Sequence, residues 1–212
     1  MSKGKREENI RKIISMEDRI IGCKRCPTSL RCIRKPSMGK GDLEPEAVLI
    51  FESHTNYLND IDNIKLIRNT ITEELGIKRI YHTFLVRCQP KACTLLNNTN
   101  CYGNSKLIDK DFNCILNNKP CMGVSVPPSD EQIIACLPYA VEETAILKSQ
   151  YVFLFGTRVA EFMLKSWGKF DEVDYDLPYI DKVDDTNVII VDDEENFDND
   201  YCKQIKLLDI FN

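Results

Sequence analysis

The stretch SDEQIIACLPYAVEETAILKSQYVFLFGTRVAEFML, residues 129–164, decides the fold class of this chain. Ser129 is a favourable helix N-cap, and Gln132 stands where a capping-box partner belongs. Apolar residues at helical spacing follow, namely Ile133, Ile134, Leu137, Ala140, Val141, Thr144 and Leu147. Residues 150–155 are a β-branched and aromatic run too apolar for an edge strand, and Gly156 and Thr157 open a second helix. Helix, buried strand, tight turn and helix are typical of a parallel α/β unit.

Strands and helices alternate through the rest of the 212 residues. We predict helices at 7–21, 61–75 and 201–211, and strands at 47–51, 80–86 and 187–191. We therefore expect a three-layer α/β/α fold with a mostly parallel central sheet. The segment 91–128 is polar, Asn-rich and without periodicity, which predicts an inserted Cys-rich subdomain within one domain spanning 1–212.

Composition and charge narrow the class of protein. A chain that is 43% hydrophobic and 29% charged is typical of globular proteins. No stretch approaches the ~20 apolar residues of a membrane helix, and the start lacks the apolar region of a signal peptide, so we expect a cytoplasmic protein without a membrane partner. Residues 1–40 carry twelve Lys and Arg against four acids, whereas residues 171–200 carry thirteen acids against one Lys. The acidic segment is expected to be a solvated surface.

The basic segment is a candidate binding surface, because a nucleic-acid interface must be positive where it meets phosphate. Its partner would be DNA or an acidic protein surface. The candidate contact residues are Lys24, Arg25, Arg31, Arg34, Lys35 and Lys40.

Ten cysteines in a reducing compartment indicate metal or cluster ligands rather than disulfides. Cys23 and Cys26 form a CxxC pair, which is half of a metal site. Cys88, after a predicted strand, and Cys136, in the predicted helix, are the candidates that complete it. Four thiolates suit zinc and an iron–sulfur cluster alike, and spacing alone does not choose between them.

A second group of cysteines lies in the 91–128 segment and consists of Cys93, Cys101, Cys114 and Cys121. One interpretation is a second, structural metal such as zinc, holding a segment that has too few apolar residues for its own core. The alternative is four unrelated thiols, because the spacing matches no zinc finger. The density of cysteines favours the metal. Cys32 and Cys202 are expected to be ordinary thiols.

Taken together, these motifs resemble the iron–sulfur (thermophile-type) uracil-DNA glycosylases. The matching segments are the CxxC at 23–26, AVLIF at 47–51, IYHTFLVRCQP at 80–90, IIACLPYAVEE at 133–143 and YVFLFGTRVAEFML at 151–164. In that family a CxxC, a cysteine in a V-[KR]-C-x-P setting and a helix cysteine ligate a [4Fe–4S] cluster. The resemblance therefore implies the glycosylase fold and a cluster on Cys23, Cys26, Cys88 and Cys136.

The same resemblance implies an active site of three loops, and none of the three matches. Where the family has Gly-Glu-x-Pro-Gly, the chain has ESHTN at 52–56, with neither Gly nor Pro. Where the family has an Asn that pairs with uracil, the chain has Phe84, at the position of the base pocket. Where the family has a His-Pro-Ser loop, the chain has DDEE at 192–195, whose carboxylates would oppose the departing uracil anion. The two histidines, His54 and His82, are expected to be satisfied structural groups.

We therefore expect a [4Fe–4S] protein with a glycosylase fold but no glycosylase activity, acting as a binding or structural subunit in DNA metabolism. Its partner would be DNA or a protein of that machinery. Two alternatives stay open. One is a DNA glycosylase for uracil or another modified base, with Glu52, Asp192 or Asp193 as its acid or base. The other is a nucleic-acid-binding protein that uses the basic N-terminal segment.

Overall fold

A six-stranded mixed sheet forms the centre of the molecule, with the strand order β1-β3-β2-β8-β10-β9. The computed structural model describes residues 3–26, 36–89, 91–92, 109, 111, 113–115, 118–120, 124–171, 176–208 and 210. Four central strands are parallel: β3 (Ile80–Phe84), β2 (Ala47–Phe51), β8 (Tyr151–Phe155) and β10 (Thr186–Val191). The edge strands β1 (Lys40–Gly41) and β9 (Tyr179–Val183) run antiparallel to their neighbours. The predicted α/β class with a mostly parallel sheet is confirmed.

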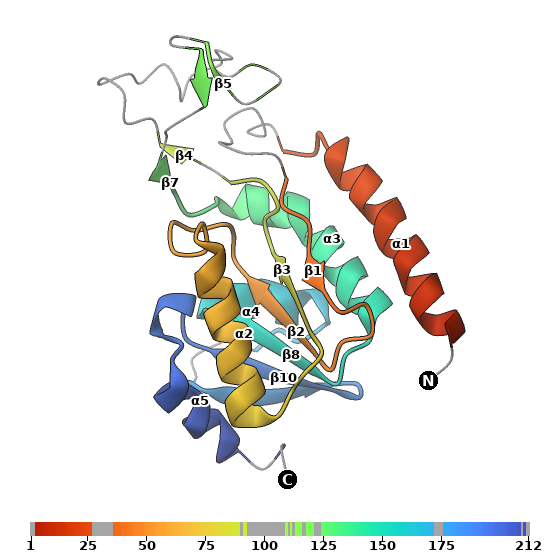
Figure 1. Cartoon of the computed structure of the whole chain (residues 1–212), viewed down its shortest axis with the longest axis vertical. Helices are drawn as coiled ribbons and strands as arrows, with labels where there is room; N and C mark the ends of the chain where they lie inside the picture. Colours follow the sequence, from red (N-terminus) through yellow and green to blue (C-terminus); the bar gives the residue numbers. More distant parts are fainter. Residues whose placement is uncertain are drawn as a thin grey trace.

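Helices cover both faces of this sheet (Figure 1). The helices α1 (Lys3–Ile21), α3 (Asp130–Leu147) and α4 (Thr157–Ser166) pack on one face, and α2 (Ile61–Leu75) and α5 (Asn199–Lys206) on the other. Side chains of a strand alternate between faces, so Val48 and Ile50 of β2 join the first apolar cluster while its other residues join the second. In the described part of the chain, no helix combines the length and apolar character of a membrane span.

Helix α3 begins as predicted and buries Ile133, Ala140 and Leu147 of the predicted stripe, but the stripe was wrong at one position. Ser129 Oγ accepts from the backbone N–H of Gln132 at 3.3 Å, and Gln132 Oε1 accepts from the N–H of Ser129 at 2.8 Å, which completes the capping box. Ile134, expected on the apolar stripe, is 60% exposed. The buried face also includes Cys136 and Glu143. A charged residue is tolerated there because polar groups from the sheet satisfy it, as described below.

The 91–128 segment leaves and re-enters the fold at neighbouring points. Strand β4 (Lys91–Ala92) pairs antiparallel with β7 (Val124–Ser125), which brings its two ends together. Strands β5 (Asn113–Cys114) and β6 (Lys119–Pro120) form a second small ladder, and β5 lies away from the helices and the central sheet in Figure 1. Of the four cysteines predicted to hold a second metal, only Cys114 belongs to the described residues. The second metal site therefore stays a prediction.

The acidic segment contains an element that the sequence did not predict. Strand β9 pairs with β10 through a tight turn at Asp184, whose φ is +52°. As an edge strand it is largely half-buried or exposed, so it lacks the apolar run by which the buried strands were found. The short 3₁₀ helix η3 (Glu194–Asn196) then links β10 to α5. The sequence predicted a connector here, so strand β9 itself was missed.

Candidate functional site

Four cysteines that lie far apart in the sequence line one small cavity beside α1, α3 and the end of β3. Cys23 and Cys26 follow α1, Cys88 lies just beyond β3, and Cys136 lies in α3. Cys136 is buried and the other three are half-buried. The structure thus brings together the four residues for which the sequence predicted a shared metal group. The space between them is about 20 Å³, which is room for about one water molecule.

The cavity disfavours negative charge on its own thiols. The pKa of Cys26 is raised to about 11, first by burial and then by the neighbouring thiols of Cys136, Cys88 and Cys23. Burial also raises the pKa of Cys136, although the backbone N–H of Arg87 donates to its Sγ at 3.3 Å. Metal ligands are thiolates, so a bound metal must itself supply the positive charge that holds four of them ionised here.

Four cysteine thiols are a donor set that suits a single zinc ion and an iron–sulfur cluster alike. Among the residues that the structure describes, no three His, Cys, Asp or Glu are placed to hold one metal ion. A single zinc draws its sulfurs to about 2.3 Å from one centre. The ligands of a four-iron cluster bind separate irons and so stand further apart, and all four are commonly cysteines. The four side chains would have to turn outward to admit such a group.

A buried ion pair lies against the cysteine cavity. Arg87, which lines the cavity, pairs with Glu143 of α3, and each side chain is only 1% exposed. Glu143 also accepts from Tyr81 Oη at 2.7 Å and from Thr83 Oγ1 at 2.5 Å. Nε and Nη1 of Arg87 have no hydrogen-bond partner among the described residues. This pair was not predicted from the sequence. The available signal was an acidic residue seven positions after Cys136, on the same face of the helix.

A second and larger cavity, of about 520 Å³, opens at the carboxyl ends of β2, β8 and β10. The helices that follow the neighbouring strands β2 and β8 pack on opposite faces of the sheet, so this edge is a topological switch point, where open α/β sheets bind ligands. Gly156 lies in the turn between β8 and α4. Its φ is +87°, and a Cβ there would lie 2.6 Å from Asp193 Oδ1, so the turn requires glycine.

One arginine bridges two acids at this strand-end cavity. Arg158 of α4 donates from Nη1 to Glu52 Oε1 at 2.7 Å and from Nη2 to Asp130 Oδ1 at 2.5 Å. Burial raises the pKa of Glu52, and the charge of Arg158 opposes this rise. Partial burial and the neighbouring acids raise the pKa of Asp193, which also lines the cavity. The cavity therefore carries carboxyl groups that retain protons more readily than usual and an arginine that is already paired.

The other acids after β10 have different roles. Asp192, a candidate acid or base, does not line the cavity but accepts from Asp193 N at 2.8 Å and from Asn196 Nδ2 at 3.0 Å. It stabilises its own turn. Glu194, expected on a solvated face, is only 7% exposed and accepts from Thr55 Oγ1 at 2.7 Å. That expectation was wrong for Glu194, because η3 turns its side chain inward towards the loop after β2.

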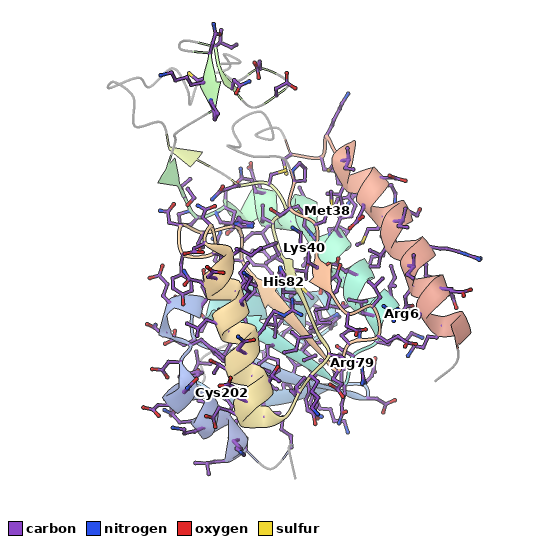
Figure 2. All side chains as sticks on the ribbon, viewed as in Figure 1. Arg6, Met38, Lys40, Arg79, His82 and Cys202 are labelled. Carbon is purple, nitrogen blue, oxygen red and sulfur yellow. The ribbon has the colours of Figure 1, made fainter. Side chains whose placement is uncertain are left out.

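The base-pocket position is filled by an aromatic core. Phe84 is 1% exposed, and its ring centroid lies 6.0 Å from that of Phe51 and 4.6 Å from that of His54. His82, two residues earlier, lies beside Lys40 of β1 (Figure 2). Burial, and next the charges of Arg68 and Lys40, lower the pKa of His82 to about 4. Its Nδ1 has no partner among the described residues, so the expectation of a satisfied histidine was wrong for that atom.

Three of the six candidate binding residues lie in the described part of the chain. Lys24 and Arg25 are exposed beside the cysteine cavity, and the guanidinium of Arg25 lies 4.7 Å from the centroid of the Tyr139 ring that lines it. Lys40 is exposed on β1. Arg31, Arg34 and Lys35 lie outside the described residues.

Neither the known family models nor the curated protein sequences include a match to this chain. The likeness to uracil-DNA glycosylases therefore rests on the sequence motifs, and function must be argued from the geometry of the site.

Proposed function

We propose that this chain is a [4Fe–4S] protein of the uracil-DNA glycosylase type that does not excise uracil and acts as a binding or structural subunit in DNA metabolism. The observation that carries the proposal is the meeting of Cys23, Cys26, Cys88 and Cys136 at one cavity. These residues come from three separate parts of the chain, so a metal group held there would couple its own binding free energy to folding. The bound cluster would supply a cross-link between the segment after α1, the end of β3 and α3.

Two features of the strand ends support the absence of uracil excision. Phe84 occupies the aromatic core where an amide would have to face the base, so the edge of uracil has no hydrogen-bond partner there. Carboxyl groups of Glu52 and Asp193 line the neighbouring cavity, where a departing anion requires donors. Loss of one such donor alone typically lowers the rate by ~10²–10³.

The test of the cluster is spectroscopic. Protein purified without oxygen should show the broad visible absorption of an iron–sulfur protein, and Cys136→Ala should abolish it. Cys202→Ala is the matched control, because Cys202 is a fully buried thiol of α5 in the other apolar cluster (Figure 2). A colourless, folded wild-type protein would contradict the proposal.

The test of inactivity is a single-turnover assay with excess protein on single-stranded and duplex oligonucleotides that contain uracil. We expect no abasic product above a control without protein. Product that depends on Glu52, and is therefore lost in Glu52→Gln, would restore the first loop as an active site.

One observation favours a second candidate function, a glycosylase for another modified base. The strand-end cavity of about 520 Å³ contains Glu52, a carboxyl whose pKa is raised by burial, as a general acid requires. Oligonucleotides with a panel of modified bases test it. Base release that is abolished by Glu52→Gln and kept by Asp192→Asn would support this function, since Asp192 lies outside the cavity.

The basic residues beside the cysteine cavity favour nucleic-acid binding as the third candidate. Lys24 and Arg25 are both exposed there, and phosphate contacts make affinity fall steeply with salt. We expect the double variant Lys24→Glu/Arg25→Glu to bind single-stranded or duplex DNA more weakly and with a shallower salt dependence. Unchanged binding and an unchanged salt slope would refute a role for this surface.

A further inference from the structure

We propose that Arg87 is a positioning residue for the metal group of the cysteine cavity. Its buried guanidinium, anchored by Glu143, directs N–H donors and positive charge at that group and stabilises its reduced, more negative state. This inference rests on the proposed [4Fe–4S] cluster and adds a residue that is not one of its ligands.

The first observation is an unsatisfied buried cation. Arg87 is 1% exposed, and of its side-chain nitrogens Nη2 donates to Glu143 while Nε and Nη1 have no partner in the described part of the chain. Buried donors without acceptors are destabilising, and more so when charged, so a native protein rarely keeps them. Arg87 itself lines the cavity of the four cysteines. Sulfur atoms of a metal group in that cavity would be the acceptors that the described residues do not supply.

The second observation is that the backbone of Arg87 is held by hydrogen bonds at both its N–H and its carbonyl without help from a metal. Its backbone N–H donates to Cys136 Sγ at 3.3 Å, its carbonyl accepts from Ser37 N at 2.7 Å, and the next residue is Cys88. Arg87 thus lies between two of the predicted ligands.

The carboxylate that anchors Arg87 is itself anchored. Tyr81 and Thr83 both lie on β3. Tyr81 donates to Oε1 of Glu143 and Thr83 donates to its Oε2. A guanidinium held in this way is oriented before any metal binds, so no free energy is spent on ordering it later.

The consequence for redox chemistry follows from charge. When a one-electron reductant such as dithionite reduces the metal group, that group gains one negative charge, and no covalent bond breaks and no proton moves. A positive charge and N–H donors in a site screened from water stabilise the added charge, and hydrogen bonds to cluster sulfurs are an established determinant of potential. Lys24 and Arg25 also lie beside the cavity, but both are exposed and are therefore screened by solvent.

The experiment compares reduction potentials in two variants that differ only at position 87. Glu143→Gln keeps an acceptor for Tyr81 and Thr83 but leaves the charge of Arg87 uncompensated, so the potential should rise. Arg87→Met/Glu143→Gln removes that charge and the donors without leaving a buried ion, so the potential should fall below that of the wild type. We expect each shift to correspond to at least a tenfold change in the equilibrium constant of reduction, which is ~59 mV for a one-electron couple.

The control is a second ion pair whose acid also lies on α3. Arg19 of α1 and Glu142 of α3 lie 2.5 Å apart, but their side chains are 49% and 39% exposed. Arg19→Met/Glu142→Gln should leave the potential unchanged, because solvent screens that pair.

Iron and sulfide content separate the possible failures. A wild-type protein without iron would overturn both the cluster and the role of Arg87. Fully loaded variants whose potentials equal that of the wild type, or shift in the same direction, would overturn the role of Arg87 and leave the cluster intact. If the double variant does not bind the cluster, the test is the comparison of Glu143→Gln with the wild type. A reduction potential of Glu143→Gln that is not higher than that of the wild type would overturn the inference. If neither variant loads, Arg87→Lys decides, because it loses Nε and the planar fork, and an unchanged potential refutes the proposal.

Discussion

Replacement of Glu143 by Ala should be among the most damaging single changes in the described part of this molecule. The substitution leaves Arg87 as a buried charge without its partner, and it also removes the acceptors of Tyr81 Oη and Thr83 Oγ1. Loss of one member of a buried ion pair costs about 3–5 kcal/mol, and a buried hydroxyl without a partner adds about 1–3 kcal/mol. Domains are stable by about 5–15 kcal/mol in total, so a large fraction of the stability is lost.

Urea unfolding followed by circular dichroism, without oxygen, measures this effect. With a slope of about 3 kcal/mol per molar, a loss of about 3–5 kcal/mol lowers the midpoint by about 1–2 M. Glu142→Ala changes the neighbouring residue, whose ion pair is partly exposed, and should shift the urea midpoint little. Arg87→Met/Glu143→Gln should recover part of the lost stability, because no buried charge remains. Equal midpoints for Glu143→Ala and Glu142→Ala would refute the reasoning.

Three further predictions concern the metal, the base pocket and pH. Cys136→Ala should lose its iron and unfold at a lower urea concentration than the wild type, whereas Cys202→Ala should keep a full content of iron. Phe84→Asn should restore no uracil excision, because it places an amide in an apolar core, and it should lose about 3–5 kcal/mol of stability as a large buried side chain is truncated. The pKa of His82 is lowered to about 4 in the folded protein, from a value near 6.5 in the unfolded chain. Between these two pH values the unfolded chain binds a proton that the folded protein does not bind. The free energy of unfolding should therefore fall by about 3 kcal/mol as pH drops from 6.5 to 4. His82→Gln should flatten that slope in urea titrations at pH 4 to 7, and an unchanged slope would refute the assignment.

The sequence predicted the fold where local pattern and tertiary environment agree. The five residues of β2 and the five of β8 are apolar and buried on both faces, as parallel central strands require. The helix cap at Ser129 followed from chemistry contained within four residues. Strand β9 was missed because a half-exposed edge strand needs no apolar run, and its pairing with β10 is a long-range property.

The candidate site was predictable only in part, because its polar contacts, like the pairing of β9, join residues far apart in the sequence. The four cysteines could be grouped in advance because many cysteines in an expected reducing compartment indicate metal ligands, and these four match the ligand positions of the family that the sequence resembles. The Arg87–Glu143 pair could not, because a charged residue is expected at the surface unless its partner is known, and the partner lies 56 positions away. The same holds for Glu194, whose burial depends on a hydrogen bond from Thr55 in a distant loop.

The iron and acid-labile sulfide content of anaerobically purified protein tests the central claim most directly. A [4Fe–4S] cluster on Cys23, Cys26, Cys88 and Cys136 predicts four irons and four sulfides per chain, and none of either in Cys136→Ala. Folded wild-type protein that contains zinc without sulfide, or no metal at these cysteines, would contradict it.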